Sequence, residues 1–249
     1  MTKTMRTFVF FISLFCIGQL LAQDTDTTAT KKLKLNNSYG LRIGTDLNKI
    51  IRTITSDEYN GFEINGDYRL TKKYYAAAEI GTEKIELNET SISTTTSGGY
   101  LKAGVDYNAH KNLIGMRNLI FVGLRYGVAT FNQELDNFSI ATRNSFFENP
   151  QLSNDFSNDG LTAHWVEFLA GLKAEIFNNL FLGFNVSLRF MISEDKPDGF
   201  DNTFIPGFGK TSDFSDVGTG FNYYISYYIP LYKKKQKIKK KEQEKETDN

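Results

Sequence analysis

Between Leu161 and Ile192 the sequence alternates between apolar and polar residues twice, once on each side of Asn178-Asn179. In both halves the apolar residues occupy even-numbered positions. They are Val166, Phe168, Ala170, Leu172, Ala174, Ile176, Leu180, Leu182, Phe184, Val186, Leu188, Phe190 and Ile192. A period of two is typical of a β-strand with one apolar face. The stretch therefore predicts a hairpin of two long strands, each suited to a tilted membrane strand of roughly ten residues.

The turn of this hairpin decides which residues face each other across it. The two apolar faces lie on the same side only if the loop holds an odd number of residues. We therefore expect the loop Phe177-Asn178-Asn179, with an asparagine in the left-handed conformation. This register places Glu167 opposite Arg189 on the polar face.

The N-terminus has the pattern of a secretory signal peptide, which we assign to residues 1–22. Two basic residues precede an apolar run over 8–21, which is too short to span a membrane. An uncleaved anchor is the alternative. The only cysteine, Cys16, lies in this run, so we expect no disulfide and no cysteine-ligated metal in the mature chain. The polar residues 23–37 are expected to form a flexible periplasmic lead-in.

Six further stretches alternate in the same way, and the connections between strands alternate in length. The six stretches are 39–47, 62–70, 74–85, 100–108, 119–131 and 221–231. With the two strands of the hairpin over 161–192 counted sixth and seventh, the chain has eight strands. The longer connections follow the first, third, fifth and seventh strands, at 48–60, 86–99, 132–160 and 193–220. Outer-membrane barrels have short periplasmic turns and long outer loops. The sequence therefore predicts an all-β protein, an eight-stranded antiparallel up-and-down transmembrane β-barrel over 38–232, with both ends in the periplasm.

The polar faces of these strands carry charges and glycines, whereas the apolar faces carry no charge in the central part of any strand. An eight-stranded barrel has an interior just wide enough for side chains. If the charged faces point inward, acids and bases pair in the lumen beside the glycines. We expect an ion-pair network formed by Arg42, Glu63, Arg69, Glu79, Lys102, Asp106, Arg125, Glu167, Lys173, Glu175 and Arg189. A soluble barrel with its apolar faces inside is the alternative.

Catalytic and metal-binding patterns are weak in this sequence. His164-Trp165 begins a strand at the outer rim, where we interpret the two residues as an interfacial anchor. In an enzyme His164 would act as a general base with Ser157 or Asp155. The outer loops are acidic, but their spacing matches no calcium loop, so no metal and no cofactor are expected. The loop phenylalanines either pack loop against loop or expose an adhesive surface; they are Phe146, Phe147, Phe200, Phe204 and Phe214.

Charge is distributed unevenly along the chain. The balanced total of 29 basic and 29 acidic residues includes a lysine-rich stretch at 233–249. Without this stretch and the signal peptide the chain is mildly acidic, which gives no reason to expect nucleic acid. We interpret 233–249 as a solvated periplasmic tail. The alternative is electrostatic contact with peptidoglycan or a periplasmic partner.

Several segments together resemble the eight-stranded outer-membrane barrels of Bacteroidota, in particular an uncharacterised family labelled a domain of unknown function. The segments that carry the resemblance are 39–44, 66–70, 107–116, 122–127, 164–167, 174–184, 205–208 and 229–234. Residues 219–225 also look like the last-strand signal read by the barrel-assembly machinery. The chain departs from that signal because it continues past its final aromatic residue, Tyr232. The resemblance implies an outer-membrane location and brings no known activity.

These observations favour a structural or binding function. We expect a monomeric barrel with an ion-paired, plugged lumen and four outer loops, in contact with outer-membrane lipid and lipopolysaccharide. One alternative is an outer-membrane hydrolase that modifies lipid or protein and requires His164. Another is a narrow solute channel, which the large inward side chains argue against.

Overall fold

The computed structural model describes residues 36–88, 92–110, 117–139, 151–152, 156–197, 200–212 and 215–235. The chain divides into two units, residues 1–35 and residues 36–249. The predicted signal peptide and nearly all of the predicted lead-in lie outside the described residues. The predicted tail lies outside them from residue 236 onward, and its first three residues belong to the last strand.

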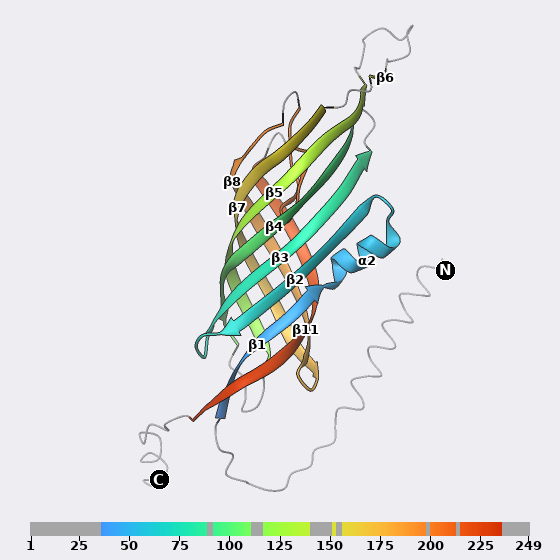
Figure 1. The fold of residues 1–249 in the computed structure, drawn as a ribbon. Helices are drawn as coiled ribbons and strands as arrows, with labels where there is room; N and C mark the ends of the chain where they lie inside the picture. The colour runs from blue at the N-terminus through green and yellow to red at the C-terminus, as the bar shows by residue number, and fades with distance from the viewer. Residues whose placement is uncertain are drawn as a thin grey trace, which may run out of the picture. The chain divides into compact units, whose positions relative to one another are not determined.

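Eight antiparallel strands form a closed ring (Figure 1). The strands are β1 (Asn36–Asp46), β2 (Tyr59–Arg69), β3 (Tyr74–Asn88), β4 (Ile92–Asn108), β5 (Leu119–Ser139), β7 (Phe156–Phe177), β8 (Leu180–Glu194) and β11 (Val217–Lys235). Each strand pairs with its neighbours along the chain, and β1 pairs with β11 to close the ring. A two-residue strand, β6 (Gln151–Leu152), pairs with the end of β5. The predicted fold class is confirmed.

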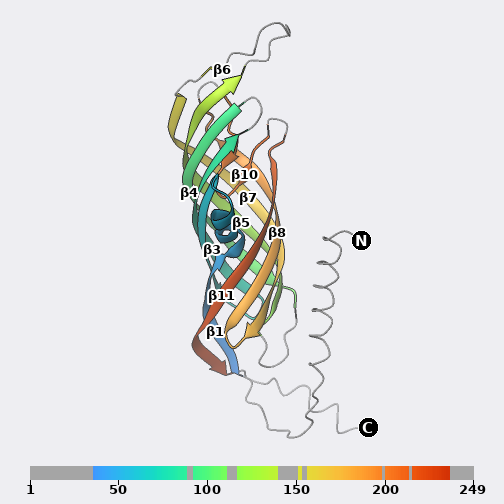
Figure 2. The same ribbon diagram turned by 90° about the vertical axis from the view of Figure 1, so that its right-hand side faces the viewer.

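The barrel has two different ends. At the turn end lie the start of β1, the end of β11 and short connections such as Asn178-Asn179. At the loop end lie the connections that the sequence predicts to be long. Figure 2 shows the strands inclined between the two ends.

Along each strand, the polar residues of the alternating pattern face the interior of the barrel and the apolar residues face outward. On β8, buried Asn185, Ser187 and Arg189 alternate with outward-facing residues. The rise from Leu182 to Ile192, both exposed, corresponds to about 33 Å along the strand and, at a tilt of about 40°, to about 25 Å along the barrel axis. This height matches the apolar band of transmembrane barrels, about 25 Å.

The hairpin turn differs from the predicted three-residue loop. Phe177 pairs with Leu180, so Asn178 and Asn179 alone form the turn, and β7 has a bulge between Glu175 and Phe177. A two-residue turn alone would put the apolar faces of β7 and β8 on opposite sides of the sheet. The one extra residue in the bulge moves the following side chains to the other face, so both apolar faces lie on the same side. Asn179 has a φ of 64°, which confirms an asparagine in the left-handed conformation.

Strand pairing extends beyond the predicted strands at the loop end. The predicted loop at 86–99 is mostly strand, since β3 reaches Asn88 and β4 begins at Ile92. Within the predicted loop at 132–160, β5 continues to Ser139 and β7 begins at Phe156. The prediction ended these strands where apolar alternation stopped. Backbone pairing does not require an apolar face, so polar residues continue the ladder.

The predicted loop at 48–60 contains a helix, α2 (Leu47–Thr55). Asp46 caps it by accepting a hydrogen bond from the backbone nitrogen of Asn48 at 2.7 Å. The apolar residues Leu47, Ile50, Ile51 and Ile54 recur at helical spacing, a signal that the strand-based prediction missed. Within the described residues, no helix has the length and apolar character needed to span a membrane.

Candidate functional site

The interior of the barrel holds a set of ion pairs arranged along its axis. Near the middle, Lys102 Nζ lies 3.0 Å from Glu79 Oε2, and Arg125 contacts the other oxygen of Glu79 at 3.5 Å. Arg125 Nη2 also donates to Asp106 Oδ2 at 3.0 Å, and Arg125 Nη1 lies 2.8 Å from Asp106 Oδ1. These four side chains come from β3, β4 and β5, which are neighbours in the ring. Their alternation directs each one inward.

Glu167 connects this cluster to the opposite wall. Its carboxylate lies 3.4 Å from Lys102 Nζ and 3.5 Å from Arg189 Nε. Glu167 and Arg189 also pair directly in the β7–β8 ladder, which confirms the register predicted from the sequence. Because Glu167 and Lys102 are each only 1% exposed, the ions have no water shell to replace a lost partner.

A second cluster lies closer to the turn end. Asp67 accepts from Arg42 Nε and from Lys173 Nζ, both at 2.8 Å. Asp67 and Lys173 are 106 residues apart in sequence, and they meet because the closed barrel brings β2 and β7 across the lumen from each other. The sequence places Asp67 on a polar face, but its role as the shared acceptor depends on closure.

A third cluster lies near the loop end and includes residues outside the predicted network. Glu83 accepts from Lys49 Nζ and from the Tyr59 hydroxyl, both at 2.5 Å, and from the backbone nitrogen of Gly207 at 2.7 Å. The hydroxyl of Tyr100 donates to Glu63. The sequence analysis did not include Lys49 in the ion-pair network, because Lys49 lies on α2, in a segment predicted to be a loop.

The structure places two predicted network members at the edge of the lumen. Arg69 lies over the rings of Tyr39 and Tyr75 and donates to the Thr71 carbonyl at 3.0 Å. Glu175 is partly exposed at the turn end, 3.9 Å from Arg117. The other nine predicted members, Arg42, Glu63, Glu79, Lys102, Asp106, Arg125, Glu167, Lys173 and Arg189, are buried in the interior.

An apolar cluster fills the barrel between the ions and the loop end. The two-residue strands β9 (Phe204–Ile205) and β10 (Gly209–Lys210) form a small hairpin within the predicted loop at 193–220. Its side chains Ile205 and Phe208 pack into the interior. Their cluster includes Tyr100, Ala129, Phe131, Leu161, Ala163 and Trp165.

Trp165 belongs to this cluster and is fully buried, so the interpretation of Trp165 as an interfacial anchor is wrong. The ring of Phe208 lies edge-on to it at 5.9 Å. Gly127 provides the space, since a Cβ atom there would lie 2.2 Å from Trp165 Cε2. Phe204 and Ile205 are likewise internal, so they do not form an exposed adhesive surface. Phe146, Phe147 and Phe214 lie outside the described residues.

His164 points the other way from Trp165. Its Nδ1 atom lies 3.2 Å from the hydroxyl of Tyr126, an outward-facing residue of β5. In the described part of the chain, no hydrogen bond joins His164 to Ser157, and Asp155 lies outside that part. The catalytic arrangement considered for His164 therefore has no geometric support here.

The acidic residues of the loop end are used in local contacts. Asp195 accepts from the backbone nitrogen and the hydroxyl of Thr162, at 2.9 and 2.6 Å. These hydrogen bonds lower the pKa of the Asp195 carboxyl below its ordinary value. Asp201 pairs with Lys196 at 2.8 Å. No group of three or more metal-ligating side chains occurs among the residues that the structure describes.

The geometry defines a class of protein: a β-barrel with a largely apolar exterior and a charged, densely filled interior. The family model described as "Domain of unknown function (DUF6048)" matches residues 1–234, so the chain belongs to that family. No curated protein matches the chain.

Solved structures with a similar arrangement include two of Ail, the attachment invasion locus protein of Yersinia pestis. One is 10% identical, covers 77% of this chain and 97% of Ail, and has a TM-score of 0.36. The other, in complex with the heparin analogue sucrose octasulfate, is 12% identical with the same coverage and a TM-score of 0.33. Similarities of this size say nothing about what this chain binds.

Proposed function

We propose that this protein is an outer-membrane barrel of structural or binding type, with a lumen closed to solutes and a loop end facing outward. One observation carries the proposal: apolar side chains cover the outside of the strands, while the acids and bases of the same strands are buried inside. A water-soluble barrel would have the opposite arrangement, because apolar burial stabilises folding in water.

The upper limit of the apolar exterior is visible on β3. Ile80 faces outward and is exposed, whereas Lys84 and Glu86, farther toward the loop end, form an exposed ion pair at 3.6 Å. A lipid-facing lysine or arginine at mid-bilayer depth costs about 2–4 kcal/mol, so we place Lys84 and its partner Glu86 outside the hydrocarbon. This placement supports a membrane-spanning belt that ends below them.

The closed lumen follows from two obstacles in series. Ion pairs occupy the middle of the barrel, and the β9–β10 hairpin fills the loop end with Ile205 and Phe208. The proposal assigns no catalytic role to His164, whose ring faces Tyr126. The ligand class of a binding function depends on the loop end and on the wall beside it.

Cell fractionation and conductance test this proposal. We expect the protein in the outer-membrane fraction, resistant to alkaline carbonate, and no steady current steps from the purified protein in planar bilayers. Recovery as a soluble protein without detergent would overturn the membrane placement. Steady current steps would leave that placement intact and overturn the closed lumen. Replacement of residues 204–210 by a short glycine-serine linker serves as the comparison, because it removes one obstacle only.

A further inference from the structure

The wall of the barrel lacks a strand segment near the loop end. β1 ends at Asp46, opposite Tyr224 of β11, and its pairing with β2 ends at Thr45. β11 continues for seven more residues, Val217 to Tyr223, which pair with β8 on one side and, among the described residues, with no strand on the other. The helix α2 lies in this interval between β11 and β2, beside the start of β2 (Figure 1).

Hydrogen bonds attach the helix to β2 and, through Lys49 and Glu83, to β3. Thr53 donates to the carbonyl of Gly61 at 3.0 Å and accepts from its backbone nitrogen at 2.8 Å, which joins α2 to β2. No hydrogen bond joins α2 to β11 among the described residues. Unpaired backbone at membrane depth is tolerated where it lines a polar cavity. The interval between α2 and β11 is such a place.

A cavity of about 430 Å³ occupies this interval. Its lining runs from α2 through the lumen residue Glu83 to β11 and the β9–β10 hairpin. The charged residues that line it are Asp46, Lys49, Arg52, Glu83, Arg189 and Lys210. With Glu167, which pairs with Arg189, included in the balance, four cations face three carboxylates, and this cationic excess favours an anionic occupant.

Two buried charged side chains, Arg189 and Asp46, line the cavity. Arg189 is buried, and its Nη1 atom donates to the Phe208 carbonyl at 2.5 Å. Gly220 allows the guanidinium to lie against β11, since a Cβ atom there would lie 2.3 Å from Arg189 Nη2. The Oδ2 atom of Asp46 is buried without a hydrogen-bond partner, although Oδ1 caps α2. An occupant with both a negative charge and a donor group, such as a hydroxyl, matches this pattern.

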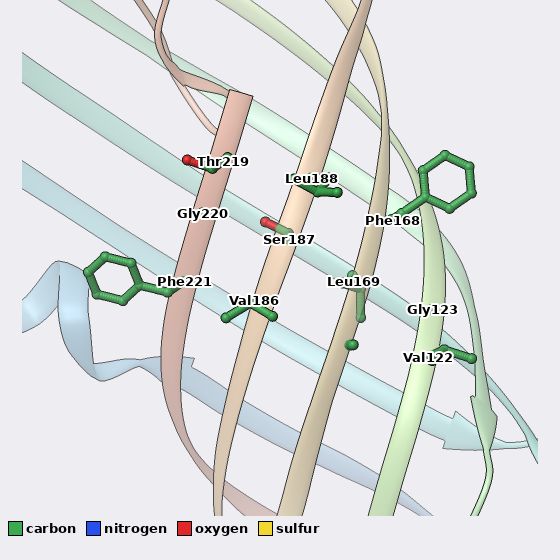
Figure 3. A pocket seen from close by; sticks show the side chains of 11 residues that line it. Val122, Gly123, Phe168, Leu169, Val186, Ser187, Leu188, Thr219, Gly220 and Phe221 are labelled. Atoms are coloured by element: carbon green, nitrogen blue, oxygen red, sulfur yellow. The ribbon is translucent and has the colours of Figure 1, made fainter. Parts of the chain in front are cut away.

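An apolar groove of about 570 Å³ continues from the same place on the outside of the barrel. The groove and the cavity share Thr219, Gly220 and Phe221. The residues that line the groove lie on β11, β8, β7 and β5, which are adjacent in the ring, and Figure 3 shows them spread from Phe221 to Val122. Four strands at a spacing of about 4.8 Å give a length of roughly 14 Å. The other outward side chains that line it are Phe168, Ala170, Val186 and Leu188.

We propose that this joint site binds one membrane lipid with a phosphate in its head group. The phosphate enters the cavity between α2 and β11 and pairs with Arg52, Lys210 and Arg189. A hydroxyl of the head group donates to Asp46, and an acyl chain lies in the groove over Ala170. A polar cavity that adjoins an apolar groove at Phe221 fits an amphipathic molecule better than a soluble anion. The inference rests on the membrane placement proposed above.

Lipid binding to the purified full-length protein in detergent tests the site. Native mass spectrometry gives dissociation constants for dimyristoylphosphatidylglycerol, for dimyristoylglycerol, which lacks the phosphate, and for glycerol phosphate, which lacks the chains. We expect dimyristoylphosphatidylglycerol to bind at least about ten-fold more tightly than dimyristoylglycerol or glycerol phosphate. Equal binding of dimyristoylglycerol would overturn the role of the cations. Equal binding of glycerol phosphate would show a site for soluble phosphates and overturn the lipid.

Two pairs of variants locate the binding. Arg52→Gln combined with Lys210→Gln removes exposed cations of the cavity, and we expect about ten-fold or more weaker binding. Lys84→Gln, an exposed cation outside the cavity, is the control and should change nothing. Ala170→Trp fills the groove and should weaken lipid binding, whereas Ala78→Trp on the exposed face of β3 should not.

Equal effects in either pair would overturn the location of the site. The tryptophan emission of the charge variants checks their folding, because Trp165 is the only tryptophan of the natural chain and is buried. A chain found soluble in cells would remove the proposed function. A membrane barrel without lipid selectivity would remove this inference alone.

Discussion

At the scale of single residues, burial decides what each ion pair contributes. Glu167 is buried between two cations, whereas Glu175 is partly exposed and lies 3.9 Å from Arg117. Both are glutamates of β7 and both face the same side of the sheet. The difference between them is the dielectric surroundings, because exposed pairs are screened by water and buried pairs are not.

Glu167→Ala should therefore destabilise the barrel strongly, because Lys102 and Arg189 lose a shared buried partner. We expect a loss of about 3–5 kcal/mol in the free energy of unfolding. The matched variant Glu175→Ala should lose only about 0–1 kcal/mol. Urea titration of the protein folded in lipid vesicles, followed by Trp165 fluorescence, measures both. Equal losses would mean that water reaches Glu167. A double-mutant cycle with Arg189 should show coupling if the predicted register holds.

At the scale of elements, α2 takes the position in the wall that the end of β1 leaves open. A helix cannot form a ladder with a strand, so its attachment depends on side chains. Thr53 provides the bond to Gly61 of β2, whereas Thr55 donates only to Ile51 of its own helix, at 2.8 Å. The two threonines therefore differ in whether they attach α2 to the barrel.

Thr53→Val should loosen α2 from β2. We expect faster hydrogen exchange at the Gly61 amide and a loss of about 1–2 kcal/mol in the local free energy of opening. Thr55→Val, an exposed change in the same helix, is the control. Hydrogen exchange measured by nuclear magnetic resonance in micelles reads the Gly61 amide directly. Unchanged exchange in the Thr53 variant would show that backbone packing alone holds the helix.

At the scale of the whole molecule, the closed ring separates two chemistries that alternate along every strand. Closure turns one face into an apolar belt and the other into an interior where acids and bases meet. Among the described residues, closure gives each of the eight long strands a neighbour on both sides, and beside α2 the ladder between β1 and β11 ends before β11 does. The direction that we propose for the barrel in the membrane places the turn end, with the start of β1 and the end of β11, in the periplasm.

Single-cysteine labelling tests that direction. Cys16, the only cysteine, lies in the predicted signal peptide, and we expect the mature chain to offer no competing thiol. Asn88→Cys at the loop end should react with an impermeant maleimide on intact cells, because it lies beyond the belt. Lys72→Cys, exposed in the turn between β2 and β3, should react only after lysis. The reverse pattern would contradict the proposed orientation.

Much of the fold follows from local patterns that the sequence contains. The pairing of Glu167 with Arg189 follows from alternation and one asparagine turn. Trp165 stands at a position whose parity points inward, although its residue type suggested the membrane interface. Lys49 and Phe208 reach the interior from segments without strand periodicity, so no local pattern placed them there. The assignment to Bacteroidota, the signal peptide and the contact with the barrel-assembly machinery stay predictions.

The sequence by itself determined the eight strands, their faces and the register of the β7–β8 hairpin, because a period of two is a local property of a strand with one apolar face. Only the tertiary structure decided which distant charges share a partner, as Lys173 and Arg42 share Asp67. It also decided that α2 replaces a strand segment and that the β9–β10 hairpin fills the loop end. These features depend on ring closure, which brings side chains together across the lumen independently of their separation in sequence.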